Sequence, residues 1–114
     1  MRDGIQWLAE AEEGNYPGRP GSDYVSLWAG VRRVRSGQGE LTVRAIWGHN
    51  NVVLEEHGRV TRRYRADNWN DLLRVAVSEV RTDIMFTGHH DSLVAAAKSA
   101  IFDAADAEAE AGTV

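Results

Sequence analysis

Apolar residues recur every three to four positions in the C-terminal half of the chain and predict two helices there. In residues 69–84 this stripe follows Asp67 or Asn68, either of which can cap a helix N-terminus. Residues 93–105 repeat the pattern with many alanines, after an interruption that ends in Asp91 or Ser92. We expect the remaining residues, 106–114, to fray. The apolar stripe of the first helix comprises Trp69, Leu72, Leu73, Ala76, Val77, Val80 and Ile84.

At the other end of the chain, Ile5, Leu8 and Ala11 are spaced to share one side of a short helix over residues 3–13. Gly14 would end this helix. Residues 14–23, the segment GNYPGRPGSD, contain both prolines and three glycines, which predicts a structured loop.

Between these helices, apolar and polar residues alternate over 24–65, which favours antiparallel strands. The apolar residues of 24–35 also fit the spacing of a helix. Folding the chain about Ser36–Gly39 resolves this in favour of a strand, because three complementary pairs then share one register. These pairs are Arg35 with Glu40, Val34 with Leu41, and Trp28 with Trp47.

Two further turns, at 48–51 and at His57-Gly58, extend this hairpin into a meander with strands at 40–47, 52–56 and 60–65. The predicted fold is therefore α+β: a single domain, 1–114, with an N-terminal helix, an antiparallel β-meander of three to four strands, and two C-terminal helices packed on one face of the sheet. If 24–35 were helical instead, Arg33 would leave the sheet and Trp28 would not oppose Trp47.

Because side chains alternate along a strand, this register assigns each residue to one face of the sheet. The predicted core face carries Trp28, Gly30, Val34, Leu41, Val43, Ala45, Trp47, Val52 and Leu54. The opposite face carries Ala29, Val31, Arg33, Arg44, Ile46, Val53, Glu55, Arg62 and Tyr64.

Charge is sorted by position along the chain. Residues 31–65 carry a net charge of +5, whereas 1–30 carry −3 and 66–114 carry −6, which together give the formal −4. This separation predicts a basic surface on the strands and acidic surfaces elsewhere. An alternative is that the strand arginines only form local ion pairs with Glu40, Glu55 and Glu56.

The composition narrows the class of protein. Cysteine is absent, which excludes disulfides and thiolate chemistry. No run approaches the ~20 apolar residues of a membrane span, and the first residues lack a signal-peptide pattern. We therefore expect a soluble, cytoplasmic protein without a membrane partner. No motif indicates a cofactor.

Motifs for catalysis are weak. No serine lies in a nucleophile elbow, and no glycine pattern matches a phosphate loop or a dinucleotide site. His89, His90 and Asp91 have the composition of metal ligands, but adjacent residues point in different directions and no second cluster has zinc spacing. A metal-dependent hydrolase at this turn is the third hypothesis, and a non-catalytic function is favoured.

The predicted exposed sheet face leads to the first two hypotheses. Arginine, tyrosine and aliphatic residues are enriched at interface centres, so the first is a protein-interaction or assembly module, binding a protein partner or forming a homo-oligomer. Its contact residues would be Val31, Arg33, Arg44, Ile46, Val53, Arg62 and Tyr64. The second is nucleic-acid binding, although the chain as a whole is acidic. Its contact residues would be Arg32, Arg33, Arg35, Arg59, Arg62, Arg63 and Arg65.

Overall fold

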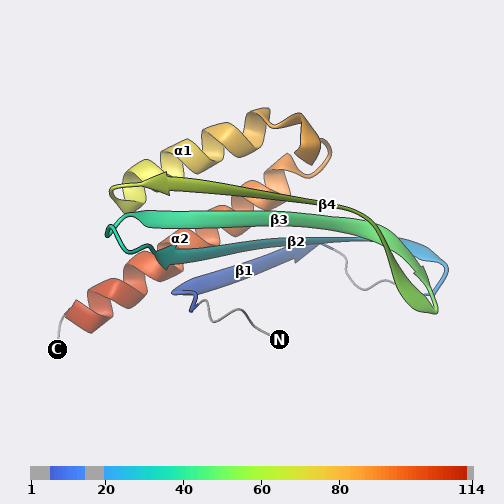
Figure 1. The fold of residues 1–114 in the computed structure, drawn as a ribbon, viewed down its shortest axis with the longest axis horizontal. Coiled ribbons are helices and arrows are strands. Elements are labelled where there is room, and N and C mark those ends of the chain that lie inside the picture. Colours follow the sequence, from blue (N-terminus) through green and yellow to red (C-terminus); the bar gives the residue numbers. More distant parts are fainter. Residues whose placement is uncertain (1–5, 15–19, 113–114) are drawn as a thin grey trace.

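The computed structural model describes residues 6–14 and 20–112 of the chain, which form a sheet and a layer of helices (Figure 1). In chain order the elements are β1 (Ala9–Gly14), β2 (Ser22–Arg33), β3 (Gly39–Asn51), β4 (Val53–Ala66), α1 (Trp69–Thr82), the 3-10 helix η1 (Ile84–Phe86) and α2 (His90–Gly112). The four strands lie in the order β1-β2-β3-β4 and all neighbours are antiparallel. The prediction of an α+β fold with an antiparallel meander and two C-terminal helices is confirmed.

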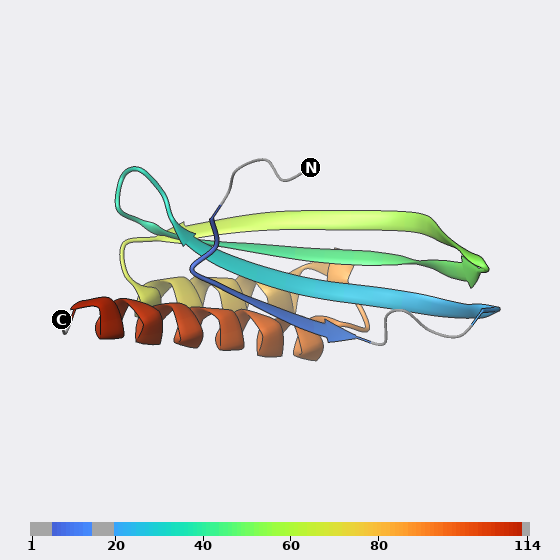
Figure 2. The same ribbon diagram turned by 90° about the horizontal axis from the view of Figure 1, so that it is seen from below.

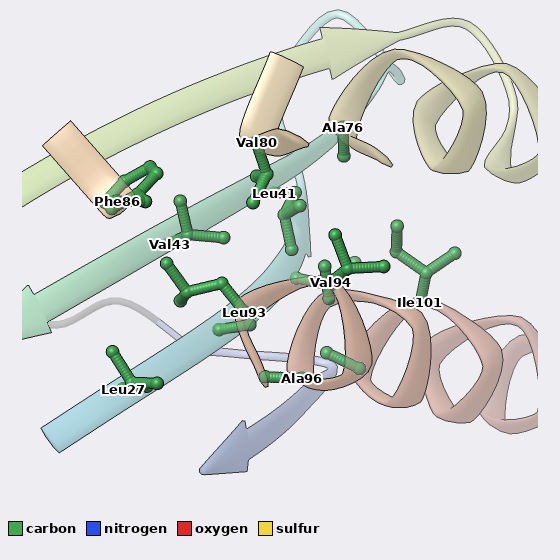
Figure 3. Close-up of a cluster of buried hydrophobic side chains, with 14 of the residues drawn as sticks. Leu27, Leu41, Val43, Ala76, Val80, Phe86, Leu93, Val94, Ala96 and Ile101 are labelled. Atoms are coloured by element: carbon green, nitrogen blue, oxygen red, sulfur yellow. The ribbon is translucent and has the colours of Figure 1, made fainter. Parts of the chain in front are cut away.

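Both helices cover the same face of the sheet, which we call the helix face (Figure 2). Apolar side chains from β2, β3 and β4 meet there with apolar side chains from α1, η1 and α2 (Figure 3). Leu41, Leu72, Phe86 and Leu93 are all fully buried. Full burial of each such side chain contributes roughly 1.5–3 kcal/mol, so this layer is the main source of stability. On the opposite side of the sheet, which we call the open face, no helix of the described residues covers the strands (Figure 2).

The predicted N-terminal helix is wrong for the part that the structure describes. Residues 9–14 form an edge strand, β1, whose register with β2 runs from Ala9 opposite Val31 to Gly14 opposite Ser26. Ala9 and Ala11 pack against the core, while Glu10 and Glu12 point to the other side. This alternation with a period of two is that of a strand. The start of the predicted helix, residues 3–5, lies outside the described residues.

The predicted strand at 24–35 is confirmed as a strand, but its register with β3 is wrong by three residues. Glu40 lies opposite Arg32 rather than Arg35, and Leu41 lies opposite Val31 rather than Val34. The turn is longer than expected: the backbone N–H of Val34 donates to the carbonyl of Gln38 at 3.0 Å. Gly37 supplies the positive φ of +92° that this turn requires.

Because side chains alternate along a strand, a shift in register by an odd number of residues, here three, exchanges the two faces of β2. Leu41, Val43, Ala45 and Trp47 pack on the helix face as expected. They are joined there by Leu27, Ala29 and Val31 instead of by Trp28 and Gly30, which lie on the open face. The three other residues predicted for the core face do not pack there: Val34 lies in the turn, and Val52 and Leu54 are exposed.

The predicted turn at His57-Gly58 is also wrong, because β4 runs without a break from Val53 to Ala66. A bulge near Trp47 and Gly48 absorbs the irregularity, so that Trp47 lies opposite Gly58 and Gly48 lies opposite Glu56. A side chain at position 58 would have its Cβ 2.1 Å from the Trp47 ring. Gly58 is therefore needed for the close approach of this ring, not for a turn.

The two helices match their predicted positions, with a difference at the C-terminus. Asn68 caps α1, since its side chain accepts a hydrogen bond from the backbone N–H of Asp71 at 2.8 Å. α2 begins at His90 and continues to Gly112, so most of the tail expected to fray is helical. The indole of Trp69 donates to Glu108 at 2.9 Å, which attaches the end of α2 to the start of α1.

The sheet is longer than the helices that support it. Figure 2 shows β2, β3 and β4 continuing beyond the ends of α1 and α2 at the side where β3 turns into β4. At this distal end Val52 is 86% exposed and Val53 is 71% exposed. No helix in the described part of the chain is long and apolar enough to cross a membrane.

Candidate functional site

The open face of the sheet carries most of the strand arginines. The register places Trp28 opposite Arg44, Arg32 opposite Glu40, and Thr42 opposite Arg63 on this side. Together these side chains line a groove of about 680 Å³ that crosses all four strands. The groove is lined by Trp7, Glu10, Glu12, Trp28, Arg32, Glu40, Thr42, Arg44, Arg59, Thr61, Arg63 and Arg65.

Glu40 organises one end of the groove. Its side chain is only 1% exposed, and its two carboxylate oxygens accept hydrogen bonds from Arg32 Nε and Arg65 Nε, both at 2.8 Å. Burial alone raises the pKa of Glu40, but the two hydrogen bonds and the charges of both arginines together lower it below its ordinary value. Glu40 is therefore a buried anion that orients two guanidinium groups at the surface.

Trp28 organises the middle of the groove. Its indole N–H donates to Glu10 at 3.1 Å, and its ring lies edge-on to Trp7 with 4.9 Å between the centroids. The guanidinium of Arg44, directly opposite in register, lies 4.7 Å from the ring centroid of Trp28. Gly30 leaves room for both rings, since a Cβ there would lie 2.5 Å from Trp28. Trp28 is buried, with Trp7 and the guanidinium of Arg44 in contact with its ring.

On the open face of β3 and β4, arginine side chains outnumber the carboxylates that form ion pairs with them. Arg59 pairs with Glu56 at 2.7 Å, and this contact lowers the pKa of Glu56. Arg63 is exposed, and within the described residues it has neither an ion pair nor a hydrogen bond from its side chain. The two other carboxylates of the groove, on Glu10 and Glu12, belong to β1 at its far side. The open face is thus basic over β3 and β4 and acidic over β1.

The residues predicted to bind a partner do not share one face. Arg44 and Ile46 lie on the open face, whereas Val53 is exposed at the distal end of the sheet. Val31 is fully buried in the core, because the slip in register turns it towards the helices. The predicted common surface is therefore corrected to a smaller one around Arg44.

The three other predicted contact residues lie at the helix face. Arg62 pairs with Asp83 at 2.9 Å. Tyr64 is half-buried against the core, and burial, followed by the charges of Asp83 and Glu79, raises its pKa to about 12. Arg33 donates two hydrogen bonds of 2.8 Å to Glu108, and its guanidinium lies 4.1 Å from the ring centroid of Trp69. These contacts tie the sheet to the helices.

The same division applies to the arginines predicted to bind nucleic acid. Arg32, Arg59, Arg63 and Arg65 lie together on the open face. Arg33 and Arg62 lie on the helix face, where both are ion-paired. Arg35 is exposed in the turn between β2 and β3.

The turn that contains His89, His90 and Asp91 has no geometry for a metal. A ring nitrogen of His90 lies 2.7 Å from the backbone carbonyl oxygen of Asp83, and Asp91 is exposed in the first turn of α2. In the part of the chain that the structure describes, no three His, Asp or Glu side chains come close enough to hold a metal ion. The hydrolase hypothesis gains no support from the structure.

Of the twelve residues that line the groove, sequence reasoning missed seven as site residues: Trp7, Glu10, Glu12, Trp28, Glu40, Thr42 and Thr61. The alternation Glu40, Thr42, Arg44 in β3 is a signal that could have located the polar side of this strand. Comparisons with protein families, curated proteins and solved structures found no match for this chain. Its function has to be argued from the groove itself.

Proposed function

We propose that this protein is a non-catalytic binding module whose open sheet face recognises an acidic segment of a partner protein. The observation that carries the proposal is the excess of positive charge in the groove. Five arginines, Arg32, Arg44, Arg59, Arg63 and Arg65, line it from three strands. Only Glu40 and Glu56 among the described carboxylates form ion pairs with them.

Local ion pairing therefore does not account for these arginines. Arg32 and Arg65 share the single carboxylate of Glu40, and Arg63 has no acidic partner among the described residues. Arginine and tryptophan together are typical of interface centres. An acidic segment that crosses β3 and β4 would supply the missing carboxylates, since guanidinium and carboxylate groups form strong charge-assisted hydrogen bonds.

A protein fits this groove better than a nucleic acid does. Nucleic-acid sites on sheets use exposed aromatic rings to stack bases, but the ring of Trp28 is covered by Arg44 and Trp7. Glu10 and Glu12 line the same groove and would repel a phosphate backbone. A polypeptide can offer acidic groups to the arginines and hydrogen-bond donors to these two glutamates.

One observation keeps nucleic acid as the second candidate. Arg59, Arg63 and Arg65 all face the groove from β4. At ~3.3 Å per residue they span about 20 Å along the strand, a length over which a phosphate backbone could follow them.

The two candidates are separated by one set of titrations. Fluorescence anisotropy would measure the affinity of the protein for a labelled polyglutamate peptide and for a labelled single-stranded DNA, at about 50 and 200 mM salt. Arg63→Glu should weaken peptide binding by roughly tenfold, because it reverses a groove charge that has no ion-pair partner in the described part of the chain. Since Arg63 is exposed, the thermal stability of this variant should equal that of the wild type.

The matched control is Arg81→Glu, which makes the same charge change at an exposed position on α1, across the sheet from the groove. It should retain peptide affinity within about twofold. Equal losses in both variants would refute a specific site on the open face. Tighter binding of DNA than of peptide, lost on Arg63→Glu, would assign the groove to nucleic acid.

A second copy of the chain is one possible source of the acidic segment. α2 exposes the acidic side chains of Asp103 and Asp106. Light scattering over a range of concentrations would show whether the protein forms such an assembly. A monomer at high concentration would leave only a different protein as partner.

A further inference from the structure

We infer that the hydroxyl of Thr42, at the floor of the groove, is a ligand-binding group that donates a hydrogen bond to one side-chain carboxylate of the acidic segment. This inference rests on the proposed function and names the anchor point of the ligand. Thr42 lies in the middle of β3, lines the groove, and is 5% exposed. Its Oγ1 is covered by neighbouring atoms and has no hydrogen-bond partner among the described residues, so a ligand reaches it only after a side chain of the groove turns aside.

A buried hydroxyl without a partner is unusual, because most buried polar side-chain atoms are hydrogen-bonded. Thr42 gains nothing for the fold from this hydroxyl, since valine has nearly the same shape and carries no polar atom. The neighbouring polar groups are already engaged elsewhere: both oxygens of Glu40 are taken by Arg32 and Arg65. The unpartnered hydroxyl therefore indicates a group that is supplied from outside the described residues.

The surroundings of Thr42 define the chemistry of that group. In register it lies between Arg63 on β4 and Gly30 on β2, and Arg44 follows it two positions along β3 on the same side. Guanidinium groups can only donate hydrogen bonds, and the hydroxyl of Thr42 is a free donor. A ligand group that pairs with the two guanidinium groups and with the hydroxyl has to be a negatively charged hydrogen-bond acceptor.

A carboxylate suits this position better than a phosphate. The rings of Trp28 and Trp7 occupy the space above Gly30 and form an apolar wall beside Thr42. The methylene groups of a glutamate side chain can pack on such a wall while its carboxylate reaches the floor. Glu10 and Glu12 on the same groove oppose a doubly charged phosphate more strongly than a singly charged carboxylate.

The test compares Thr42→Val with Thr42→Ser in the titration with labelled polyglutamate. Thr42→Val removes the hydroxyl and keeps the shape, so it should weaken peptide binding by roughly tenfold, the size expected for a hydrogen bond to a charged group. Thr42→Ser keeps the hydroxyl and should bind within about twofold of the wild type. Thermal unfolding of the free protein should show Thr42→Val at least as stable as the wild type, because it removes an unsatisfied buried group.

Two outcomes would overturn the inference. Unchanged peptide affinity of Thr42→Val would show that the hydroxyl does not contact the ligand. A lower melting temperature or failure of this variant to fold would show that the hydroxyl serves the fold, for example through a buried water. Competition at constant ionic strength adds a third arm: displacement of the peptide by inorganic phosphate more readily than by acetate would refute the carboxylate assignment.

Failure of this inference is distinguishable from failure of the proposed function. If Arg63→Glu weakens binding and Thr42→Val does not, the groove binds the acidic segment without the proposed anchor. If neither variant changes the affinity, the segment does not bind in the groove at all.

Discussion

Replacing Glu40 by glutamine tests how strongly the buried carboxylate holds the open face together. The side chain of Glu40 is 1% exposed and accepts two hydrogen bonds of 2.8 Å from arginines. Glutamine has the same shape but no charge, and its amide group can accept from only one of the two guanidinium groups. It directs N–H donors towards the other, which has no acceptor capacity.

The size of the effect follows from the exposure of the partners. A hydrogen bond to a charged group contributes about 1.5–3 kcal/mol. The side chains of Arg32 and Arg65 are 31% and 55% exposed, so both can turn to water when the carboxylate is lost. Discounting for this, we expect Glu40→Gln to lower the free energy of unfolding by about 2 kcal/mol. For a chain of this size, that corresponds to a melting temperature lower by roughly 8 °C.

The assay is urea unfolding at neutral and acidic pH, with Glu56→Gln as the control. Glu56 also accepts hydrogen bonds from an arginine, but its side chain is 43% exposed, so its replacement should leave the stability almost unchanged. Equal effects of the two substitutions would refute the reasoning that burial makes Glu40 different.

The pH dependence provides an independent check. Because the pKa of Glu40 is lower in the folded protein than its ordinary value of 4.5, the unfolded chain binds this proton more tightly. The stabilisation is complete above the ordinary value and is lost as the pH falls through the lower, folded value. The difference between wild type and Glu40→Gln should therefore be constant at neutral pH and shrink below about pH 4. A difference that grows on acidification would contradict the assignment.

Three further predictions concern the helix layer. Leu41→Ala should cost about 3 kcal/mol in urea unfolding because the side chain is fully buried, whereas Val53→Ala, at an exposed position, should cost less than about 0.5 kcal/mol. Glu108→Gln weakens the hydrogen bonds that attach the end of α2 to Arg33 and Trp69. Amide hydrogen exchange should therefore become faster in residues 106–112, while the global free energy of unfolding falls by at most about 1 kcal/mol. Unchanged exchange would show that these hydrogen bonds do not hold the end of the helix. Burial and two nearby carboxylates raise the pKa of Tyr64 to about 12. The stability that the neutral phenol provides is therefore complete below the ordinary pKa of 10 and is lost as the pH rises towards 12. Tyr64→Phe should abolish this alkaline loss of stability in unfolding measurements.

The sequence could predict the meander but could not choose its register. In the segment Val31–Arg35 a valine and an arginine recur three positions apart, so a slip of three residues places the same residue types opposite Leu41 and Glu40. Pairing arguments are then satisfied by both registers. The choice depends on which face of β2 packs against the helices, and residues 27–31 are buried throughout, so their alternation gives no guidance.

Two other errors have the same origin in local signals. Glycine after histidine at 57–58 is typical of a tight hairpin, but here Gly58 accommodates the Trp47 ring. Ile5, Leu8 and Ala11 fit the spacing of a helix, so this local pattern favours a helix over the alternation of Ala9–Glu12. The strand state of this segment depends on β2, whose Trp28 donates a hydrogen bond to Glu10. Contacts between distant segments decided both cases.

For the candidate site, charge patterning predicted the correct strands but not the correct side chains. The basic stretch 31–65 does contain the five arginines of the groove. Arg33 and Arg62 pair with Glu108 on α2 and with Asp83 after α1, not with Glu40, Glu55 or Glu56 of the strands. These partners are 75 and 21 residues away in the chain, beyond the reach of any pairing argument within the meander.

The unequal lengths of sheet and helices have a consequence for recognition. The strands around Val52 and Val53 extend beyond the helices and expose these apolar side chains, and regions with so little packing open locally at low free-energy cost. The groove residues Thr42 and Arg44 instead alternate with Leu41, Val43 and Ala45, which are packed against the helix layer. The backbone beneath the groove is therefore preorganised, so a ligand bound there would lose little affinity to ordering of the protein.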